Sequence, residues 1–402
     1  MFRISQYMRE VLAPTLANGR RGSDVKPTGP VVIWNLVRRC NLACKHCYSI
    51  SADTDFSGEL STDEVRTVMA DLRAFGVPVL ILSGGEPLLR PDIFELSRHA
   101  RELGFYVGLS TNGTLIDAAM ADRIAAIGYN YVGVSLDGIG ATHDAFRRRQ
   151  GAYDASLAGI RLLRRHGIKV GLRFTMTRDN DNELPRLLDL LDAEDLDKFY
   201  FSHLNYAGRG NRNRGDDSQL DTTRWAMDLL FERCLDSIQS GRPKEFVTGN
   251  NDADAVYFLQ WLQRRFPEAV GHLHHKLTQW GGNASGIGVA NIDNLGHVHP
   301  DTMWYHYSLG SVRERPFSAI WNDLSDPLLA GLRQRPRPVT GRCGECRWLA
   351  LCNGNSRVRA FQLTGDPWAE DPACYLTDEE IGRASGERLQ LTPFRRGDNH
   401  VA

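Results

Sequence analysis

The chain has 402 residues, of which 42% are hydrophobic and 24% charged, as in a soluble globular protein with room for a large domain and a smaller one. Lys and Arg number 48 against 49 Asp and Glu, so the formal charge of −1 gives no electrostatic case for a nucleic-acid partner. No stretch approaches the roughly 20 apolar residues that span a bilayer, and the charged N-terminus lacks the apolar core of a secretory signal. Eight cysteines in such a chain favour metal or redox chemistry over disulfides, and hence a reducing cytoplasm.

After a mixed lead-in at residues 1–28, apolar runs alternate with amphipathic segments of helical spacing. The first of these helices carries a capping signal, Ser61 with Glu64. The predicted strands begin at Val31, Val77, Phe105, Tyr131, Val170 and Lys198, and the predicted helices cover 61–76, 91–104, 116–128, 155–167 and 184–195. Strands separated by such helices form a parallel sheet with right-handed crossovers. About six β/α units are too few for an eight-stranded barrel. The α/β fold expected over 29–215 is therefore a partial (β/α)6 TIM-like barrel.

The remainder of the chain is predicted to form three further regions. Residues 216–285 read as a helical connector, and Cys234 within it has the spacing of a packed core residue. Residues 286–385 are glycine-rich and strand-like and end in a second group of cysteines, which predicts a smaller second domain. Residues 386–402 form a polar tail.

Three cysteines lie close together in the run RRCNLACKHCY, at Cys40, Cys44 and Cys47. A [4Fe–4S] cluster is usually held by four thiolates, so three leave one iron open to a small molecule. The alternative is a zinc site, but zinc ligands usually come in pairs such as C-x2-C. His46 would have to complete such a site, and Cys44 and Cys47 crowd it. The spacing favours a cluster with an open iron.

Short polar motifs follow the next three predicted strands. They are Ser83–Pro87 with its two glycines, Ser110–Gly113, and Ser135–Gly138, in which Ser135 and Asp137 are candidates to bind a ribose. Parallel α/β folds bind ligands at the carboxyl ends of their strands. Turns also use these residue types for backbone reasons alone, so each motif by itself is weak. Their succession beside the cysteine loop favours one ligand site.

With these motifs the chain resembles the radical S-adenosylmethionine (radical SAM) superfamily, through C-x3-C-x2-C at 40–47, GGEP at 84–87 and the STNG and SLDG strand ends. The resemblance implies that Cys40, Cys44 and Cys47 bind the cluster and that its free iron chelates S-adenosylmethionine. It also implies a set of cofactor contacts: Gly84, Gly85 and Glu86 at the methionine amino group, His46 or Tyr48 near the adenine, Asn112 and Ser135 near the ribose or carboxylate, and Arg173 at the carboxylate. For Arg173 a cross-barrel salt bridge is an equal alternative.

The chemistry implied by this resemblance belongs to the cofactor. An electron from a low-potential donor of the flavodoxin or ferredoxin type enters the cluster and cleaves a carbon–sulfur bond of the sulfonium. The resulting 5′-deoxyadenosyl radical abstracts an unactivated hydrogen atom. The protein has to exclude water and orient the substrate. No amino-acid side chain is predicted to act as an acid or base.

The second cysteine group is Cys343, Cys346, Cys352 and Cys374. Four thiolates close a site, so structural zinc is one interpretation. In context the group resembles the SPASM or twitch extension of radical SAM enzymes, which carries auxiliary [4Fe–4S] clusters. Asp301 and Ser356 stand where further cysteines of a two-cluster extension would fall. The resemblance therefore predicts one auxiliary cluster with four cysteine ligands, in an electron-transfer or structural role.

Across nearly its whole length the chain resembles the tetrapyrrole-modifying branch of the superfamily, and within it the heme d1 biosynthesis enzymes. The implied substrate is 12,18-didecarboxysiroheme, an iron tetrapyrrole, and the implied reaction is radical modification leading to loss of propionate side chains. Such a substrate suits arginines, aromatic walls and an axial iron ligand. The candidates are Arg209, Arg212 and Arg214; Trp304, Tyr305 and Tyr307; and His272, His274, His275, His297, His299 and His306. Solvated surface is the competing interpretation for the arginines and for each histidine.

Three other functions remain open from the sequence. One is a sibling tetrapyrrole enzyme, such as a heme synthase or decarboxylase of the siroheme route. Another is a SPASM peptide maturase, although the lead-in is short for the peptide-binding element that such enzymes often carry. The third is a zinc-stabilised binding protein without catalytic activity.

Overall fold

One open sheet forms the centre of the computed structural model, which describes residues 1–12, 29–384, 386 and 388–394. The sheet has ten strands in the order β10-β9-β8-β1-β2-β3-β4-β5-β6-β7. Strands β1 to β7 are parallel, β8 is parallel to β1, and β9 and β10 are antiparallel to their neighbours. The strands are β1 (Val31–Asn35), β2 (Val79–Ser83), β3 (Tyr106–Thr111), β4 (Tyr131–Ser135), β5 (Val170–Met176), β6 (Lys198–His203), β7 (Glu245–Gly249), β8 (Val289–Ile292), β9 (His297–His299) and β10 (Gly310–Ser311).

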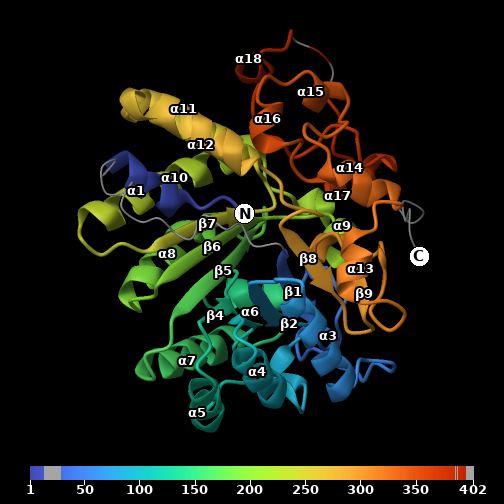
Figure 1. The fold of residues 1–402 in the computed structure, drawn as a ribbon. Helices are drawn as coiled ribbons and strands as arrows, with labels where there is room; N and C mark the ends of the chain where they lie inside the picture. The colour runs from blue at the N-terminus through green and yellow to red at the C-terminus, as the bar shows by residue number, and fades with distance from the viewer. Residues whose placement is uncertain (13–28, 385, 387, 395–402) are drawn as a thin grey trace.

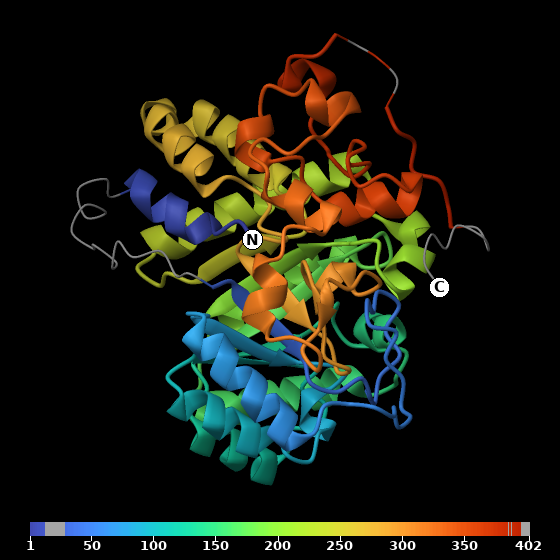
Figure 2. The same cartoon turned by 45° about the vertical axis from the view of Figure 1, so that its right-hand side comes forward.

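Helices cover the outer face of this sheet and build the C-terminal region (Figures 1 and 2). They are α1 (Ile4–Leu12), α3 (Thr62–Ala74), α4 (Ile93–Glu102), α5 (Ala118–Ile127), α6 (Ala141–Arg147), α7 (Ala152–Arg165), α8 (Leu184–Ala193), α9 (Arg209–Arg212), α10 (Leu220–Gln239), α11 (Ala253–Arg265), α12 (Val270–Trp280), α13 (Phe317–Asn322), α14 (Pro327–Arg333), α15 (Gly341–Gly344), α16 (Leu349–Cys352), α17 (Arg357–Thr364) and α18 (Asp378–Ile381). Helix α16 packs against α11 and α12. Among the described helices, none combines the length and apolar character needed to cross a membrane.

The predicted alternation of strands and helices is confirmed from β1 to β6. Ser61 caps α3: its hydroxyl accepts from the Glu64 N–H at 3.3 Å, and Glu64 accepts from the Ser61 N–H at 2.7 Å. Cys234 is fully buried in the core, as its helical spacing predicted. The predicted fold class, an α/β partial barrel, is confirmed, since parallel strands alternate with helices and the strand order leaves the sheet open.

The sheet extends beyond the six predicted units at both edges. Strand β7 lies within 216–285, a region predicted to be a helical connector, and pairs with β6. Strand β8 lies within 286–385 and pairs with β1. Helix α1, in the lead-in, packs against β7, and Phe2 is bridged to Thr248. Short strands at sheet edges give little local signal, because their stability comes from pairing with distant residues.

The strands expose alternate residues to two different surroundings. Trp34, Leu80 and Leu82 are fully buried against the outer helices, whereas Ile33 and Ile81, on the other face, are only half-buried. Cross-strand partners share a face, which places Ser135, Arg173 and Tyr200 together on the inner side. We call this inner face of β1–β6 the lumen face. Its half-buried side chains show that solvent reaches into the barrel.

Candidate cluster and cofactor site

The three cysteines of the first group lie together in the loop that follows β1. Cys40 and Cys44 are buried and Cys47 is half-buried, and they cluster with Leu42 and Ala152. Burial raises the pKa of Cys40 to about 12 and also raises the pKa of Cys44. The free thiols of Cys40 and Cys44 are therefore protonated at neutral pH, and iron binding has to displace their protons.

The GGEP turn packs directly against the start of the cysteine loop. Gly85 N–H donates to Val37 O at 2.6 Å, and Glu86 N–H donates to Arg39 O at 2.9 Å. A Cβ atom on Gly84 would meet the carbonyl oxygen of Val37, and one on Gly85 would meet that of Arg39. The close backbone approach that these glycines allow is thus to the cysteine loop.

Both carboxylate oxygens of Glu86 are bound within the protein. Oε1 accepts from the Thr111 hydroxyl at 2.7 Å, and Oε2 accepts from the Asn112 N–H at 2.7 Å. Burial raises the pKa of Glu86 to about 7. Glu86 therefore ties the end of β2 to the end of β3. A contact of this segment with the methionine amino group would have to come from other atoms of the turn.

The arginine-rich segment after β6 also holds the cysteine loop. Arg209 donates from Nε to Cys44 O at 2.7 Å and from Nη1 to Ser51 O at 2.9 Å. Gly208 has φ +54°, and a Cβ atom there would meet the carbonyl oxygens of Cys47 and Tyr48. Arg214 is buried and donates to Gln362 O at 3.2 Å. Solvated surface was one interpretation of Arg209, Arg212 and Arg214. Of these three described residues, only Arg212 is exposed.

The other predicted cofactor residues lie along the lumen face and beside the cysteines. Asn112 donates to Asn41 Oδ1 at 2.8 Å and lies 3.9 Å from Cys40 Sγ. Arg173 donates to Ser110 Oγ, and its guanidinium lies 5.3 Å from the centre of the Tyr200 ring. In the described part of the chain Arg173 forms no ion pair, so the cross-barrel salt bridge is not found.

His46 and Tyr48 flank Cys47 in different surroundings. Burial lowers the pKa of His46 to about 4, and its Nδ1 is buried without a hydrogen-bond partner among the described residues. Tyr48 accepts a hydrogen bond of 2.8 Å from Asn35, and its ring meets Tyr305 edge-on at 6.1 Å. Both side chains thus lie beside Cys47, and the adenine contact that the resemblance implies for one of them stays a prediction.

Arg147 and Asp137 form a buried ion pair beside Cys44 that the sequence analysis did not predict. Arg147, at the end of α6, donates from Nη1 to Cys44 Sγ at 3.3 Å and pairs with Asp137 at 2.5 Å. Asp137, a predicted ribose ligand, is fully buried and also accepts from the Thr175 N–H at 2.9 Å. Burial acts to raise the pKa of Asp137, but Arg147 holds it below its usual value. The run FRRRQ gives no signal of this role, because exposed arginine runs look the same.

The second cysteine group lines one pocket in the C-terminal region. The pocket is lined by Cys343, Cys346, Cys352 and Cys374 among others. Arg357 lies 4.0 Å from Cys343 Sγ, and burial raises the pKa of Cys343 to about 11. Over the described residues, no three His, Cys, Asp or Glu side chains are set to hold a single metal ion.

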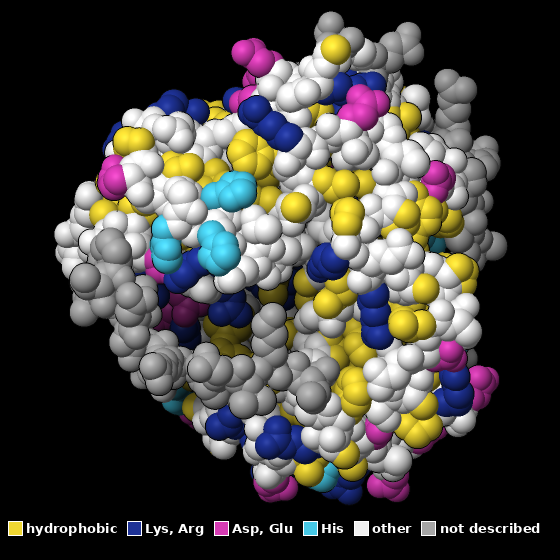
Figure 3. Space-filling view, turned by 45° about the horizontal axis from the view of Figure 1, so that its top comes forward, with side chains coloured by type: hydrophobic (Ala, Val, Ile, Leu, Met, Phe, Trp, Pro, Cys, Tyr) yellow, Lys and Arg dark blue, Asp and Glu magenta, His cyan; other side chains and the backbone are white. Residues whose placement is uncertain are grey.

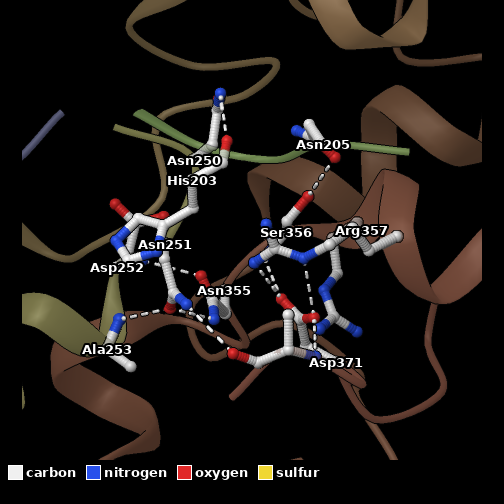
Figure 4. A network of polar contacts seen from close by, with 12 residues as sticks. His203, Asn205, Asn250, Asn251, Asp252, Ala253, Asn355, Ser356, Arg357 and Asp371 are labelled. Atoms are coloured by element: carbon white, nitrogen blue, oxygen red, sulfur yellow. Dashed lines mark hydrogen bonds and ion pairs between the residues drawn. The ribbon is translucent and has the colours of Figure 1, made fainter. Parts of the chain in front are cut away.

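A network of polar side chains connects this region with the carboxyl ends of β6 and β7 (Figure 4). Ser356 donates to Asn205 Oδ1 at 3.3 Å, and its N–H donates to Asp371 at 2.9 Å. Asp371 also forms a fully buried pair with Arg359 at 2.8 Å. Asp301 accepts from the Met303 N–H at 2.7 Å. Asp301 and Ser356, which stand where a two-cluster extension would have cysteines, thus form hydrogen bonds within the protein.

The residues proposed for an iron tetrapyrrole are scattered. His272, His274 and His275 are exposed on α12, and His297 is half-buried. Trp304 is buried among Leu328, Leu332 and Val358, and His306 stacks on Phe361 at 5.7 Å. His299 and Tyr305 are stacked at 5.4 Å, and His299 is the cross-strand partner of Asn291. Among the described aromatic and histidine rings of this set, Tyr305 is the one whose ring contacts the cysteine loop, through Tyr48. Figure 3 shows a hollow on one face of the molecule, with hydrophobic and basic side chains at its rim.

The sequence of this chain is similar to those of known proteins. The radical SAM superfamily matches residues 34–191. The chain is 58% identical over 403 residues to the pre-heme d1 synthase of Dinoroseobacter shibae, covering 100% of this chain and 98% of that protein. It is 48% identical over 360 residues to the Fe-coproporphyrin III synthase of Methanosarcina barkeri, covering 89% and 90%.

The fold is also similar to that of solved structures. The crystal structure of Streptococcus suis SuiB bound to S-adenosylmethionine matches with a TM-score of 0.68 and 18% identity, over 92% of this chain and 82% of that one. At this identity the likeness concerns the fold alone. Family membership implies S-adenosylmethionine and a [4Fe–4S] cluster. By its full-length identity, the chain belongs to the radical SAM superfamily, as an enzyme of the same family as the pre-heme d1 synthase.

Proposed function

We propose that this enzyme uses radical chemistry to remove or modify propionate side chains of 12,18-didecarboxysiroheme in heme d1 biosynthesis. The observation that supports this most is the 58% identity to a pre-heme d1 synthase over the whole chain. An open lumen beside a group of three cysteines, two of them buried and one half-buried, agrees with it.

The residues present fit the groups that this proposal requires. Cys40, Cys44 and Cys47 would hold a [4Fe–4S] cluster with one open iron, because two buried thiols and one half-buried thiol lie together with no fourth cysteine in their described group. Reduced, and with S-adenosylmethionine bound, such a cluster supplies 5′-deoxyadenosyl radical chemistry. The electron would come from a donor of the flavodoxin or ferredoxin type.

The lumen face would orient the cofactor and the substrate. Arg173 is the proposed partner of the cofactor carboxylate, since its guanidinium has no acidic partner in the described chain and neighbours Ser135 across β4 and β5. Gly84, Gly85, Asn112, His46 and Tyr48 are proposed to complete the cofactor site. Glu86 is proposed to act by positioning the β2 and β3 ends, because its oxygens are already bound.

The second cysteine group is proposed to hold one auxiliary [4Fe–4S] cluster. Its four cysteines line a single pocket, and four thiolates saturate a cluster. Such a cluster suits electron transfer or a structural role. Two clusters require about eight irons and eight sulfides per chain, whereas tightly bound zinc would indicate a structural metal protein.

The proposal is tested by anaerobic incubation of the reconstituted chain with 12,18-didecarboxysiroheme, S-adenosylmethionine and a low-potential reductant. The pigment is analysed by mass spectrometry and 5′-deoxyadenosine is quantified. We expect pigment with altered propionates together with 5′-deoxyadenosine. Unchanged pigment despite 5′-deoxyadenosine formation would exclude this substrate.

A second candidate is a sibling reaction of the siroheme route, favoured by the 48% identity to an Fe-coproporphyrin III synthase. The same experiment distinguishes the two by the product, which mass spectrometry identifies. Formation of Fe-coproporphyrin III would favour the sibling reaction.

A further inference from the structure

Arg147 is placed between a cysteine of the first group and a buried carboxylate. Its Nη1 donates to Cys44 Sγ at 3.3 Å, and its Nη2 lies 2.5 Å from Asp137 Oδ2. Arg147 is 7% exposed and Asp137 is fully buried. A charge-assisted hydrogen bond to sulfur in such surroundings is little screened by water.

The backbone fixes both partners of the pair. Ala43 N–H donates to Arg147 O at 3.4 Å, so the cysteine loop is attached to the end of α6. Asp137 Oδ1 accepts from the Thr175 N–H at 2.9 Å, and the Asp137 N–H donates to His143 Nδ1 at 3.0 Å. The guanidinium is therefore held at Cys44 and is not free to turn towards solvent.

A cation at this position favours the reduced form of a cluster bound to Cys44. Reduction adds one negative charge to the cluster, and a nearby positive charge or a hydrogen bond to a ligand sulfur stabilises it. Asp137 offsets part of the charge of Arg147 without contacting the sulfur. The two side chains thus act on the cluster in opposite directions.

We propose that Arg147 is a positioning residue that raises the reduction potential of the open-iron cluster, and that Asp137 limits this effect. The proposal rests on the proposed function, because it requires that Cys40, Cys44 and Cys47 hold the cluster. It concerns a property of the cluster itself, which can be measured without substrate turnover.

The second cysteine group supplies an internal control. There the sulfur of Cys343 has its own basic neighbour, Arg357, at 4.0 Å, and accepts from the Asp371 N–H at 3.4 Å. Of these residues, Cys343 lines the pocket of the C-terminal region. Changes at Arg147 are therefore expected to leave the potential of an auxiliary cluster unchanged.

The test is a redox titration of the anaerobically reconstituted full-length chain, followed by electron paramagnetic resonance without substrate. In Arg147→Gln we expect the ratio of reduced to oxidised open-iron cluster to fall about tenfold at a given potential, a midpoint shift of about −59 mV. Arg147→Lys keeps the charge and should shift less. The double variant Arg147→Gln/Asp137→Asn should lie between Arg147→Gln and the unchanged protein.

An unchanged midpoint in Arg147→Gln at full iron content overturns the inference. If this variant does not retain iron, Asp137→Asn decides: it must raise the midpoint, and no shift or a lower midpoint overturns the inference. Failure of the unchanged chain to assemble an open-iron cluster would instead contradict the proposed function.

Discussion

Arg209 donates a hydrogen bond of 2.7 Å to the carbonyl oxygen of Cys44, joining two residues that are 165 positions apart in the sequence. The same guanidinium donates to Ser51 O at 2.9 Å. The segment that follows β6, the last predicted barrel strand, is therefore hydrogen-bonded to the backbone of the cysteine loop. Its conformation depends on the completed barrel as well as on its own sequence.

Replacing Arg209 with Gln is expected to loosen the loop. Hydrogen bonds from a charged donor contribute about 1.5–3 kcal/mol, so the variant should lose stability of about that size and retain less iron after anaerobic reconstitution. Exposed Arg212, on the same short helix, provides the matched control as Arg212→Gln. Equal iron contents in the two variants would argue against this role of Arg209.

Gly208→Ala is expected to destabilise the fold by more than about 1 kcal/mol, because a side chain at φ +54° is strained and its Cβ would meet two loop carbonyl oxygens. Gly215→Ala is the control, since a Cβ atom there meets nothing within 4 Å. Urea unfolding of both variants measures the difference. A Gly208→Ala curve that overlies the Gly215→Ala curve would contradict the predicted clash.

Replacing a cysteine of the first group and replacing one of the second group should affect 5′-deoxyadenosine formation differently. Cys40→Ala removes a ligand of the open-iron cluster and is expected to abolish 5′-deoxyadenosine formation. Cys352→Ala removes an auxiliary ligand and should leave some cleavage uncoupled from substrate. Each variant should also lose iron relative to the unchanged chain. Cleavage persisting in Cys40→Ala would exclude the assignment of the open-iron site.

Arg173→Gln is expected to weaken the binding of S-adenosylmethionine by about tenfold, the effect of losing roughly 1.4 kcal/mol. Arg173→Lys keeps the charge but not the paired geometry and should weaken it less. Isothermal titration of the anaerobic holoprotein measures both. An unaltered affinity of Arg173→Gln for S-adenosylmethionine would contradict this role and would favour a substrate carboxylate as the partner of Arg173.

Glu86 should make the stability of the protein depend on pH. Burial raises its pKa from 4.5 to about 7, so the folded state binds the proton more tightly than the unfolded state. Its stabilising contribution is complete below pH 4.5 and is lost as the pH rises through 7, by about 3 kcal/mol at 1.36 kcal/mol per pKa unit.

Glu86→Gln cannot titrate and serves as the reference for this effect. Chemical denaturation of the metal-free chains between pH 5 and pH 8 should show the unchanged chain losing stability relative to Glu86→Gln. Parallel profiles for the two proteins would show that Glu86 does not titrate in this range.

Local sequence signals were sufficient for the barrel strands and helices and for the two cysteine groups. Alternating apolar residues, a capping box at Ser61 and the spacing of Cys40, Cys44 and Cys47 all act over a few residues, and such patterns can be read directly. Strand β7 could not be read in this way, because its pairing with β6 is what stabilises it as a strand.

What the sequence alone determined is the chemistry: two sets of thiols, one of three and one of four, and the strand ends beside the first. What only the tertiary structure decided is the use of the charged residues. Glu86 is bound within the protein, Arg209 closes the cysteine loop, and Arg147 contacts Cys44 from 103 positions away. The physical reason is that a charged side chain has the same sequence signature on the surface as in a buried pair. Which residue it pairs with depends on the folded structure.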